Sequence, residues 1–338
     1  MQKIIPAICS ALLLFSPLYA EINNPPPAYD ADLFKKETPV FSFHGSFLYW
    51  RVQEGSLDYA IKMQHPSDAN TAVYAQGKFH NATFNGDPGF RVALSYFRAP
   101  RYWEMWAQYT RFTTRGENTV HAPESADRYL NGTWPSVISG PLSEAKSNIH
   151  LNYNVADFFV DRFFVPNPHL RIRFLGGGAA AWINQNWTIH YFNAEGQESY
   201  LRNHWKFIGG GLRLGTTIDW YCGYDLYLTS LATCASLLGT YQNDAFQTAS
   251  TQTYPVRDSH YSDVRPTFTV QAMFGLSWQK SFASTRMEIF GGYELNSWFN
   301  LQEVYRSEAG LSNSGKNINV NASMLALQGL TTRVTLDF

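Results

Sequence analysis

The chain has 338 residues, a formal net charge of −1 at pH 7, 16% charged residues and a large aromatic share of 16%. Disordered segments are poor in aromatic residues, and a near-neutral chain lacks the basic surface of a nucleic-acid-binding protein. After the first 20 residues, no segment supplies the run of about 20 apolar residues that a membrane-spanning helix needs. The aromatic residues must therefore belong to a large core or to a membrane surface that is not built from helices.

The N-terminal residues 1–20 have the pattern of a signal peptide. Lys3 gives a positive start, an apolar stretch follows, and Ala20 is a plausible cleavage site. Residues 21–40 form a polar, proline-containing leader that we expect in the periplasm. Of the cysteines, only Cys222 and Cys234 remain after cleavage. On one strand they would lie roughly 40 Å apart, too far to bridge, so we expect free thiols, with an intermolecular disulfide as the alternative.

Residues 41–338 show apolar and polar residues in alternation, the period of β-strands. In 264–279 the apolar positions are even-numbered and begin at Phe268, whereas in 147–160 they are odd-numbered and run from Ile149 to Val155. If these apolar faces meet lipid, the alternate residues face a lumen. The pattern predicts ten strands, at residues 41–53, 89–98, 102–113, 147–160, 168–183, 204–219, 223–238, 264–279, 285–300 and 318–338.

Two features favour a closed antiparallel transmembrane β-barrel over a soluble sandwich. Short links, such as 161–167 and 220–222, alternate with long ones, such as 114–146 and 239–263, as expected for short periplasmic turns and long extracellular loops. Aromatic residues also gather at strand ends, as in the girdles at membrane interfaces. A hairpin of residues 57–63 and 71–80 would raise the strand count to twelve. The girdle candidates are Tyr49-Trp50, Tyr102-Trp103, Trp182, Trp205, Trp220-Tyr221 and Trp298-Phe299.

The last strand carries an assembly signal. Val334, Leu336 and the terminal Phe338 alternate with polar residues. This arrangement resembles the C-terminal signature of bacterial outer-membrane proteins, which the barrel-assembly machinery reads. The chain is therefore expected to be an integral protein of the bacterial outer membrane, exported through a cleaved signal peptide.

Several segments resemble the Legionella-type major outer-membrane protein family, which also occurs in environmental chlamydiae. They are Phe43 to Trp50, Leu57 to Ala60, Gly89 to Val92 and Trp103 to Thr110, with a weaker likeness continuing to the C-terminus. The resemblance implies a pore-forming outer-membrane barrel, and its motifs are structural rather than catalytic. Chlamydial major proteins are often rich in cysteine, unlike this chain, so a disulfide-linked envelope role is not implied.

Charged residues at alternate strand positions are the candidate pore lining. In a wide pore they would set the ion preference, whereas in a narrow barrel they would pair and plug the lumen. Together with Asp337, seven arginines face five carboxylates, which suggests at most a weak preference for anions. The pore-lining candidates are Arg91, Glu104, Arg171, Arg173, Arg213, Asp225, Arg265, Arg286, Glu288, Glu294 and Arg333.

We therefore predict a porin that passes small hydrophilic solutes or ions passively across the cell envelope. The alternative is a surface structural or adhesion barrel whose long loops bind a host surface or matrix. Asp258-Ser259-His260 resembles an acid–histidine pair of the kind found in outer-membrane proteases, but a second acidic pair is not evident. We expect no catalytic residue, cofactor or metal site, and the partners to be outer-membrane lipid and, as an open alternative, further copies of the chain.

Overall fold

The computed structural model describes residues 39–63, 77–98, 103–124, 128–134, 138, 140–167, 169–282, 285–307 and 318–338. The expected signal peptide at 1–20 and residues 21–38 of the expected leader lie outside this part of the chain. The described residues form one antiparallel sheet of 13 strands. None of its described segments is a helix long and apolar enough to cross a membrane.

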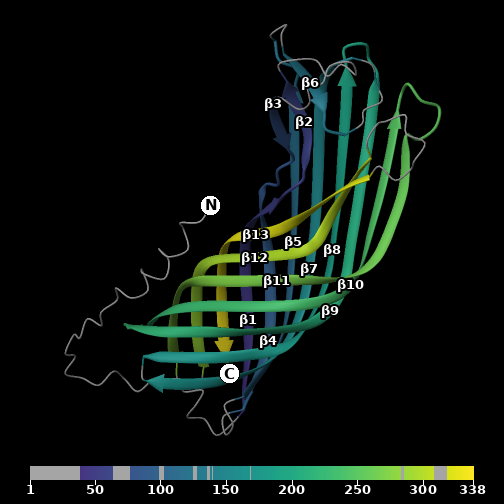
Figure 1. Cartoon of the computed structure of the whole chain (residues 1–338). Coiled ribbons are helices and arrows are strands. Elements are labelled where there is room, and N and C mark those ends of the chain that lie inside the picture. Colours follow the sequence, from purple (N-terminus) through teal and green to yellow (C-terminus); the bar gives the residue numbers. More distant parts are fainter. Residues whose placement is uncertain are drawn as a thin grey trace, which may run out of the picture.

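The strands close into a barrel (Figure 1). The hydrogen-bonded ring runs from β1 through β4, β5 and β7 to β13, and it closes where Ser42–Glu54 of β1 pairs with Leu325–Asp337 of β13. Closure satisfies every backbone group that lipid could not. The strands are β1 (Val40–Glu54), β2 (Asp58–Met63), β3 (Gly77–Asn81), β4 (Gly86–Arg98), β5 (Trp103–His121), β6 (Tyr129–Gly132), β7 (Leu142–Asn167), β8 (Leu170–Asn193), β9 (Glu198–Gly223), β10 (Leu226–Ala249), β11 (Arg257–Phe282), β12 (Thr285–Ser307) and β13 (Ile318–Asp337).

Three short strands stand beside the ring. β2 pairs with β3 and with β6, and β6 reaches the barrel through one pairing, Leu130 with Leu142 of β7. The hairpin that would have made twelve barrel strands thus forms, but it is attached at the end of the barrel opposite the C-terminus (Figure 1). We assign that end to the cell exterior, because the short turns lie at the other end.

The short turns are tighter than predicted. β7 continues to Asn167 and β9 to Gly223, so the predicted links at 161–167 and 220–222 are strand. The alternation simply continues there, since Asp161 points into the barrel and Arg162 points out. The turn after β9 consists of Tyr224 and Asp225, whose φ angles of 55° and 62° are typical of a two-residue hairpin turn.

The barrel is much taller than a membrane. A spanning strand needs about 9–11 residues, whereas β7, β9 and β11 each have 26. In the half that contains the C-terminus, large apolar side chains cover the outer face: on β9 they extend from Trp220 to Ile208, and on β1 from Phe41 to Tyr49. This half is the membrane-spanning part.

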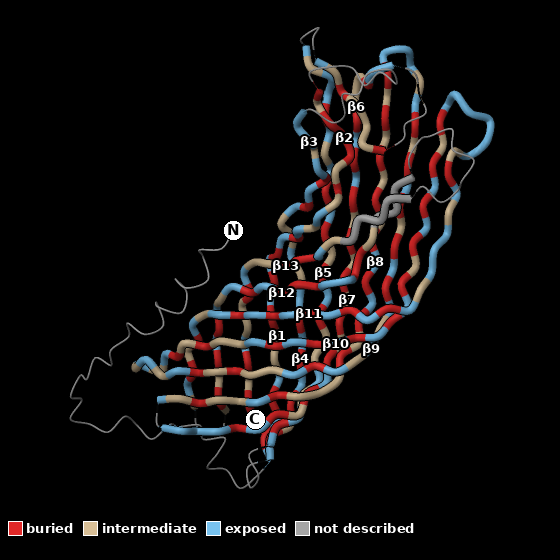
Figure 2. Tube along the Cα trace, viewed as in Figure 1, coloured by how far each residue is buried: buried red, intermediate tan, exposed pale blue. Residues whose placement is uncertain are grey.

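On the extracellular side of this apolar surface, the outer face of the strands becomes polar and the inner face becomes apolar. On β7, Ile149, Leu151, Tyr153 and Val155 are at most 2% exposed and point inward, while the residues between them are more exposed and point outward. Buried and more exposed positions alternate along the strands in Figure 2. The prediction that this apolar face meets lipid was therefore wrong. This stretch of β7 lies above the membrane, where water surrounds the barrel, so its apolar side chains turn to the interior. On β11 the apolar residues from Phe268 to Leu276 point outward, as predicted.

The aromatic girdle is smaller than predicted, and its predicted member Tyr102 lies outside the described residues. Tyr49, Trp103, Trp182, Trp220 and Phe299 point outward and are exposed. Their predicted companions Trp50, Trp205 and Trp298 are at most 1% exposed and fill the interior. In a strand, neighbouring residues point to opposite faces, so only one of two consecutive aromatic residues can reach the interface.

The change of the outer face from apolar to polar predicts where a charged substitution is tolerated. Leu214→Arg places an arginine at the middle of the apolar band of β9 and should destabilise the barrel by about 2–4 kcal/mol. Asn184→Arg, on the outer face above the band, should cost about 0–1 kcal/mol. Equilibrium unfolding in lipid vesicles measures both, and equal costs would contradict the assigned membrane boundary.

Candidate functional site

The lumen at membrane level is lined by arginine and carboxylate side chains. Nine of the predicted pore-lining residues point into it and are buried or half-buried: Arg91, Glu104, Arg171, Arg173, Arg213, Arg286, Glu288, Glu294 and Arg333. Arg265 also points inward but lies higher, where it pairs with Asp263 and Glu303. Asp225 lies in the turn between β9 and β10, not along a lumen-facing strand.

Arg91 and Glu294 form the most completely satisfied ion pair. Two guanidinium nitrogens of Arg91 donate to the two carboxylate oxygens of Glu294, at 2.7 and 3.0 Å. Gln271 and Thr331 also donate to this carboxylate, at 2.6 and 2.8 Å. The pair joins β4 to β12 across two intervening strands, and the Glu294 side chain is fully buried. Such bidentate geometry compensates much of the cost of burying two charges.

A second group of charges lies nearer the periplasmic end. Arg171 donates two hydrogen bonds to Asp219, at 2.6 and 2.8 Å. Arg173 is held more loosely, since its nearest carboxylate oxygens are 3.6 Å away on Glu104 and 3.7 Å away on Asp219. Three further pairs complete the lining: Arg213–Asp157 at 3.4 Å, Arg286–Asp337 at 3.1 Å and Arg333–Glu288 at 2.7 Å.

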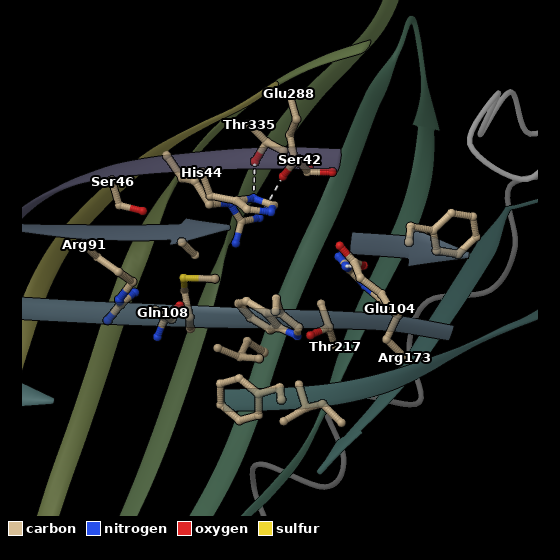
Figure 3. A pocket seen from close by; sticks show the side chains of 18 of the residues that line it. Ser42, His44, Ser46, Arg91, Glu104, Gln108, Arg173, Thr217, Glu288 and Thr335 are labelled. Carbon is tan, nitrogen blue, oxygen red and sulfur yellow. Dashed lines mark hydrogen bonds and ion pairs between the residues drawn. The ribbon is translucent and has the colours of Figure 1, made fainter. Parts of the chain in front are cut away.

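A cavity, shown in Figure 3, lies among these side chains. Its charged lining consists of Arg91, Glu104, Arg171, Arg173, Arg286, Glu288, Arg333 and Asp337. His44 on β1 and Thr335 on β13 share a hydrogen bond of 2.9 Å. Glu104 of β5 and Arg173 of β8 approach each other to 3.6 Å. The cavity has a volume of about 70 Å³, which is room for roughly five water molecules. Among the described residues, the lumen at this level thus holds a small chamber with charged, polar and apolar side chains in its walls.

Sequence reasoning missed three lumen carboxylates: Asp157, Asp161 and Asp219. Asp219 and Arg213 are both odd-numbered residues of β9, so alternation could have predicted that Asp219 points into the lumen. The other two were hidden because β7 was assigned the wrong face and ended too early. With them, six arginines meet seven carboxylates at membrane level. The arginine excess behind the predicted weak anion preference is absent.

Above the chamber, apolar side chains bridge the lumen. Tyr153 of β7 and Trp298 of β12 lie on opposite sides of the ring, with four strands between them in either direction. Their rings nevertheless meet edge to face, with centroids 5.9 Å apart, and Asn296 of β12 donates a hydrogen bond of 3.0 Å to the Tyr153 hydroxyl. This contact spans the lumen from wall to wall.

The segments around β2 and β6 extend the closure outward. Tyr191 of β8 points into the barrel and donates a hydrogen bond of 2.5 Å to the backbone carbonyl of Tyr59 on β2. Trp134, just after β6, packs edge to face on the inward Trp187, with centroids 5.7 Å apart. These residues belong to one apolar cluster with Tyr153 and Trp298. We call this cluster the apolar plug.

Asp258-Ser259-His260 does not form the acid–histidine pair that the sequence suggested. His260 instead hydrogen-bonds to Asp244 of the neighbouring strand β10, and that bond holds the pKa of Asp244 below its usual value. His204 of β9 is 3.7 Å from the same carboxylate. These side chains lie on the outer face of the extracellular half, away from the lumen. The described residues contain no group of three or more His, Cys, Asp or Glu side chains suited to a metal ion, and Cys222 and Cys234 are both free thiols.

The Arg91–Glu294 pair predicts a strongly non-additive response to substitution. Glu294→Gln leaves the Arg91 guanidinium buried without its counter-charge and should destabilise the barrel by about 3–5 kcal/mol. Replacing both residues, with Arg91→Met and Glu294→Leu, should restore most of that loss, because no unpaired charge remains. Urea unfolding of the single and double variants measures the difference. A double variant as unstable as the single one would show that the pair is not the source of the effect.

We expect Glu54, in the extracellular half, to make the stability of the barrel depend on pH. Burial raises its pKa to about 8 from 4.5, while Gln185 donates a hydrogen bond of 3.1 Å to one of its oxygens. The folded protein thus retains a proton that the unfolded chain releases, so stability falls as pH rises from about 4.5 to about 8. Glu54→Gln should be more stable than the wild type at pH 9, by on the order of 2–4 kcal/mol, and equal to it at pH 4. Thermal unfolding checks this, with Glu117→Gln, which removes an exposed carboxylate, as control.

Comparison with known proteins identifies the family. Residues 35–338 match the family model of the Legionella pneumophila major outer membrane protein precursor, while no curated protein sequence matches the chain. Among solved structures, the outer membrane protease OmpT from Escherichia coli is 10% identical with a TM-score of 0.38, covering 88% of this chain and 96% of its own. A Pseudomonas aeruginosa FadL homologue is 6% identical with a TM-score of 0.26, covering 89% of this chain and 90% of its own. The P. putida toluene transporter TodX is 8% identical with a TM-score of 0.28 and the same coverage.

Similarities at these TM-scores carry no inference about function. The family match is different in kind, because it extends over nearly the whole chain and confirms the resemblance first seen at Phe43 to Trp50. The chain belongs to the Legionella major outer membrane protein family, and it is an outer-membrane β-barrel protein.

Proposed function

We propose that this barrel is a gated porin, a channel for small hydrophilic solutes or ions that is closed in the conformation described. The observation that carries the proposal is the polar chamber at membrane level, which is lined by arginines and carboxylates from opposing walls. Charged groups within the membrane are costly and commonly mark a path for ions or polar solutes.

The extracellular half provides the comparison that favours a channel over a solid barrel. There the same ring of strands is filled by the apolar plug, with residues such as Ile149 and Trp205 fully buried. The fold can therefore accommodate an apolar interior, and replacing buried ion pairs by apolar residues is often neutral or stabilising. The six arginines at membrane level are therefore not needed to fill the barrel, and a path for polar solutes would use them.

Conductance tests the proposal. Trp298→Ala removes the indole that meets Tyr153 across the lumen, so it should raise the single-channel conductance in planar lipid bilayers above that of the wild type. Phe299→Ala is the matched control, because this neighbouring aromatic residue points outward and is 43% exposed. It should leave the conductance unchanged. Trp298→Ala should also cost about 3–5 kcal/mol of stability, so each variant is first shown to be folded.

A second function becomes the better one if neither the wild type nor folded Trp298→Ala conducts. The barrel would then be a surface structural or adhesion protein, as the tall extracellular half favours. Its outer face is polar on β7 from Lys146 to Asn154, and it stands clear of the lipid-facing band. Conductance that increases in Trp298→Ala but not in Phe299→Ala would exclude a solid barrel.

A further inference from the structure

A band of donor side chains lies on the outer face of the barrel, immediately above the lipid-facing surface of β5, β8 and β9. Its members are Arg111, Arg115, Asn184, Asn186, Arg202 and Lys206, which we call the basic band. The four cationic side chains are exposed. None of them forms an ion pair with a carboxylate in the part of the chain that the structure describes.

The position of the band follows from where the apolar outer face of each strand ends. On β5 the exposed Trp103 and Met105 precede Arg111 on the same face. Arg111 pairs with Asn154 of β7, Asn154 with Trp182 of β8, and Trp182 with Ile208 of β9. Trp182 and Ile208 are exposed apolar residues at the edge of the membrane-spanning part. One step above them on the outer face, Asn184 lies beside Lys206. The basic band therefore sits where the headgroups of the outer leaflet meet the barrel.

Hydrogen bonds orient the amides of the band. Asn152 donates to the side-chain oxygen of Asn184 at 3.1 Å, and Arg202 donates to that of Asn186 at 3.1 Å. With the oxygens engaged by neighbours, these two amides present their N–H groups to the surroundings. The band thus offers amide and cationic donors together, and the ligand that satisfies both is an anion with several acceptor oxygens.

Among the described side chains, the exposed cations just above the apolar outer surface lie on β5 and β9, with Arg51 on β1 next to β4. On β10 and β11, at comparable positions of the register, the outer face carries Asp244 and Asp258. On β5, the outward carboxylate nearest the band is Glu117, which accepts a hydrogen bond of 3.2 Å from Asn148. If the barrel attracted polar headgroups without preference, its outward cations would not need to gather on a few strands. Their gathering points to a bound anion at one place on the circumference.

We propose that the basic band binds the phosphate groups of a phosphorylated glycolipid of the outer leaflet, with its acyl chains lying along the apolar surface below Trp182 and Ile208. The apolar surface and the donors are adjacent, so one lipid molecule can contact both. Anionic lipid headgroups attract each juxtamembrane Lys or Arg residue by about 1 kcal/mol. This inference is independent of whether the lumen conducts.

The test uses the full chain purified in a neutral detergent, with bisphosphorylated lipid A as the probe and its phosphate-free form as the comparison. Binding is measured by native mass spectrometry. The double variant Arg111→Gln, Lys206→Gln should bind bisphosphorylated lipid A about 25-fold more weakly than the wild type, at about fivefold per charge removed. Arg98→Gln is the control, because Arg98 is an exposed arginine at the periplasmic end of β4, and it should bind like the wild type.

Two further measurements keep the proposal falsifiable if the double variant folds poorly. Arg111→Lys retains the charge and should bind within about twofold of the wild type. Raising the salt concentration to about 1 M shortens the screening length to about 3 Å and should weaken binding to the wild type itself. The proposal is overturned if the folded double variant binds like the wild type, or if the wild type binds phosphate-free lipid A equally well.

Discussion

Closure of the sheet is the constraint on which the rest of this barrel depends. In lipid, an open edge would leave backbone N–H and C=O groups without partners, so β1 and β13 must pair. Once the ring is closed, each strand has one face to the interior and one to the surroundings, with a strict period of two. A strand of 26 residues, such as β9, passes from lipid into water, so its two faces must change composition where the surroundings change.

The interior responds to this change in two ways. At membrane level the apolar residues face lipid, and the polar residues facing inward must satisfy one another. Arg91 and Glu294, with Gln271 and Thr331, show how completely they do so. Above the membrane the polar residues face water and the apolar residues form the plug around Tyr153 and Trp298. A polar chamber beneath an apolar closure is thus the direct consequence of one tall barrel crossing one interface.

Much of this arrangement could be predicted from the sequence, because the period of two is a local signal. The order of the barrel strands and the inward direction of Arg91, Glu288 and Glu294 follow from alternation alone. The strand lengths do not, since 114–121, 142–146, 239–249 and 257–263, all predicted to lie in long loops, are strand. The face of β7 does not, since Ile149 to Val155 alternate equally well whether the apolar side meets lipid or fills the interior. That choice depends on height relative to the membrane, which is a tertiary property. The same missing information hid Asp157 and misplaced Trp205 and Trp298.

The exchange of faces also determines how deeply and in which register the barrel sits. A shift of one residue in the pairing of a strand turns its whole inward set outward, which would place arginines such as Arg213 in lipid. Sliding the barrel towards the periplasm would draw Lys206 and Arg111 into the hydrocarbon, at about 2–4 kcal/mol for each charge near the midplane. Sliding it outward would expose Leu212 and Leu214 to water. The buried arginines therefore disfavour other strand registers. The basic band and the apolar surface together disfavour a barrel that sits deeper or higher in the membrane. The fold itself thus sets the position where the outer leaflet meets Lys206.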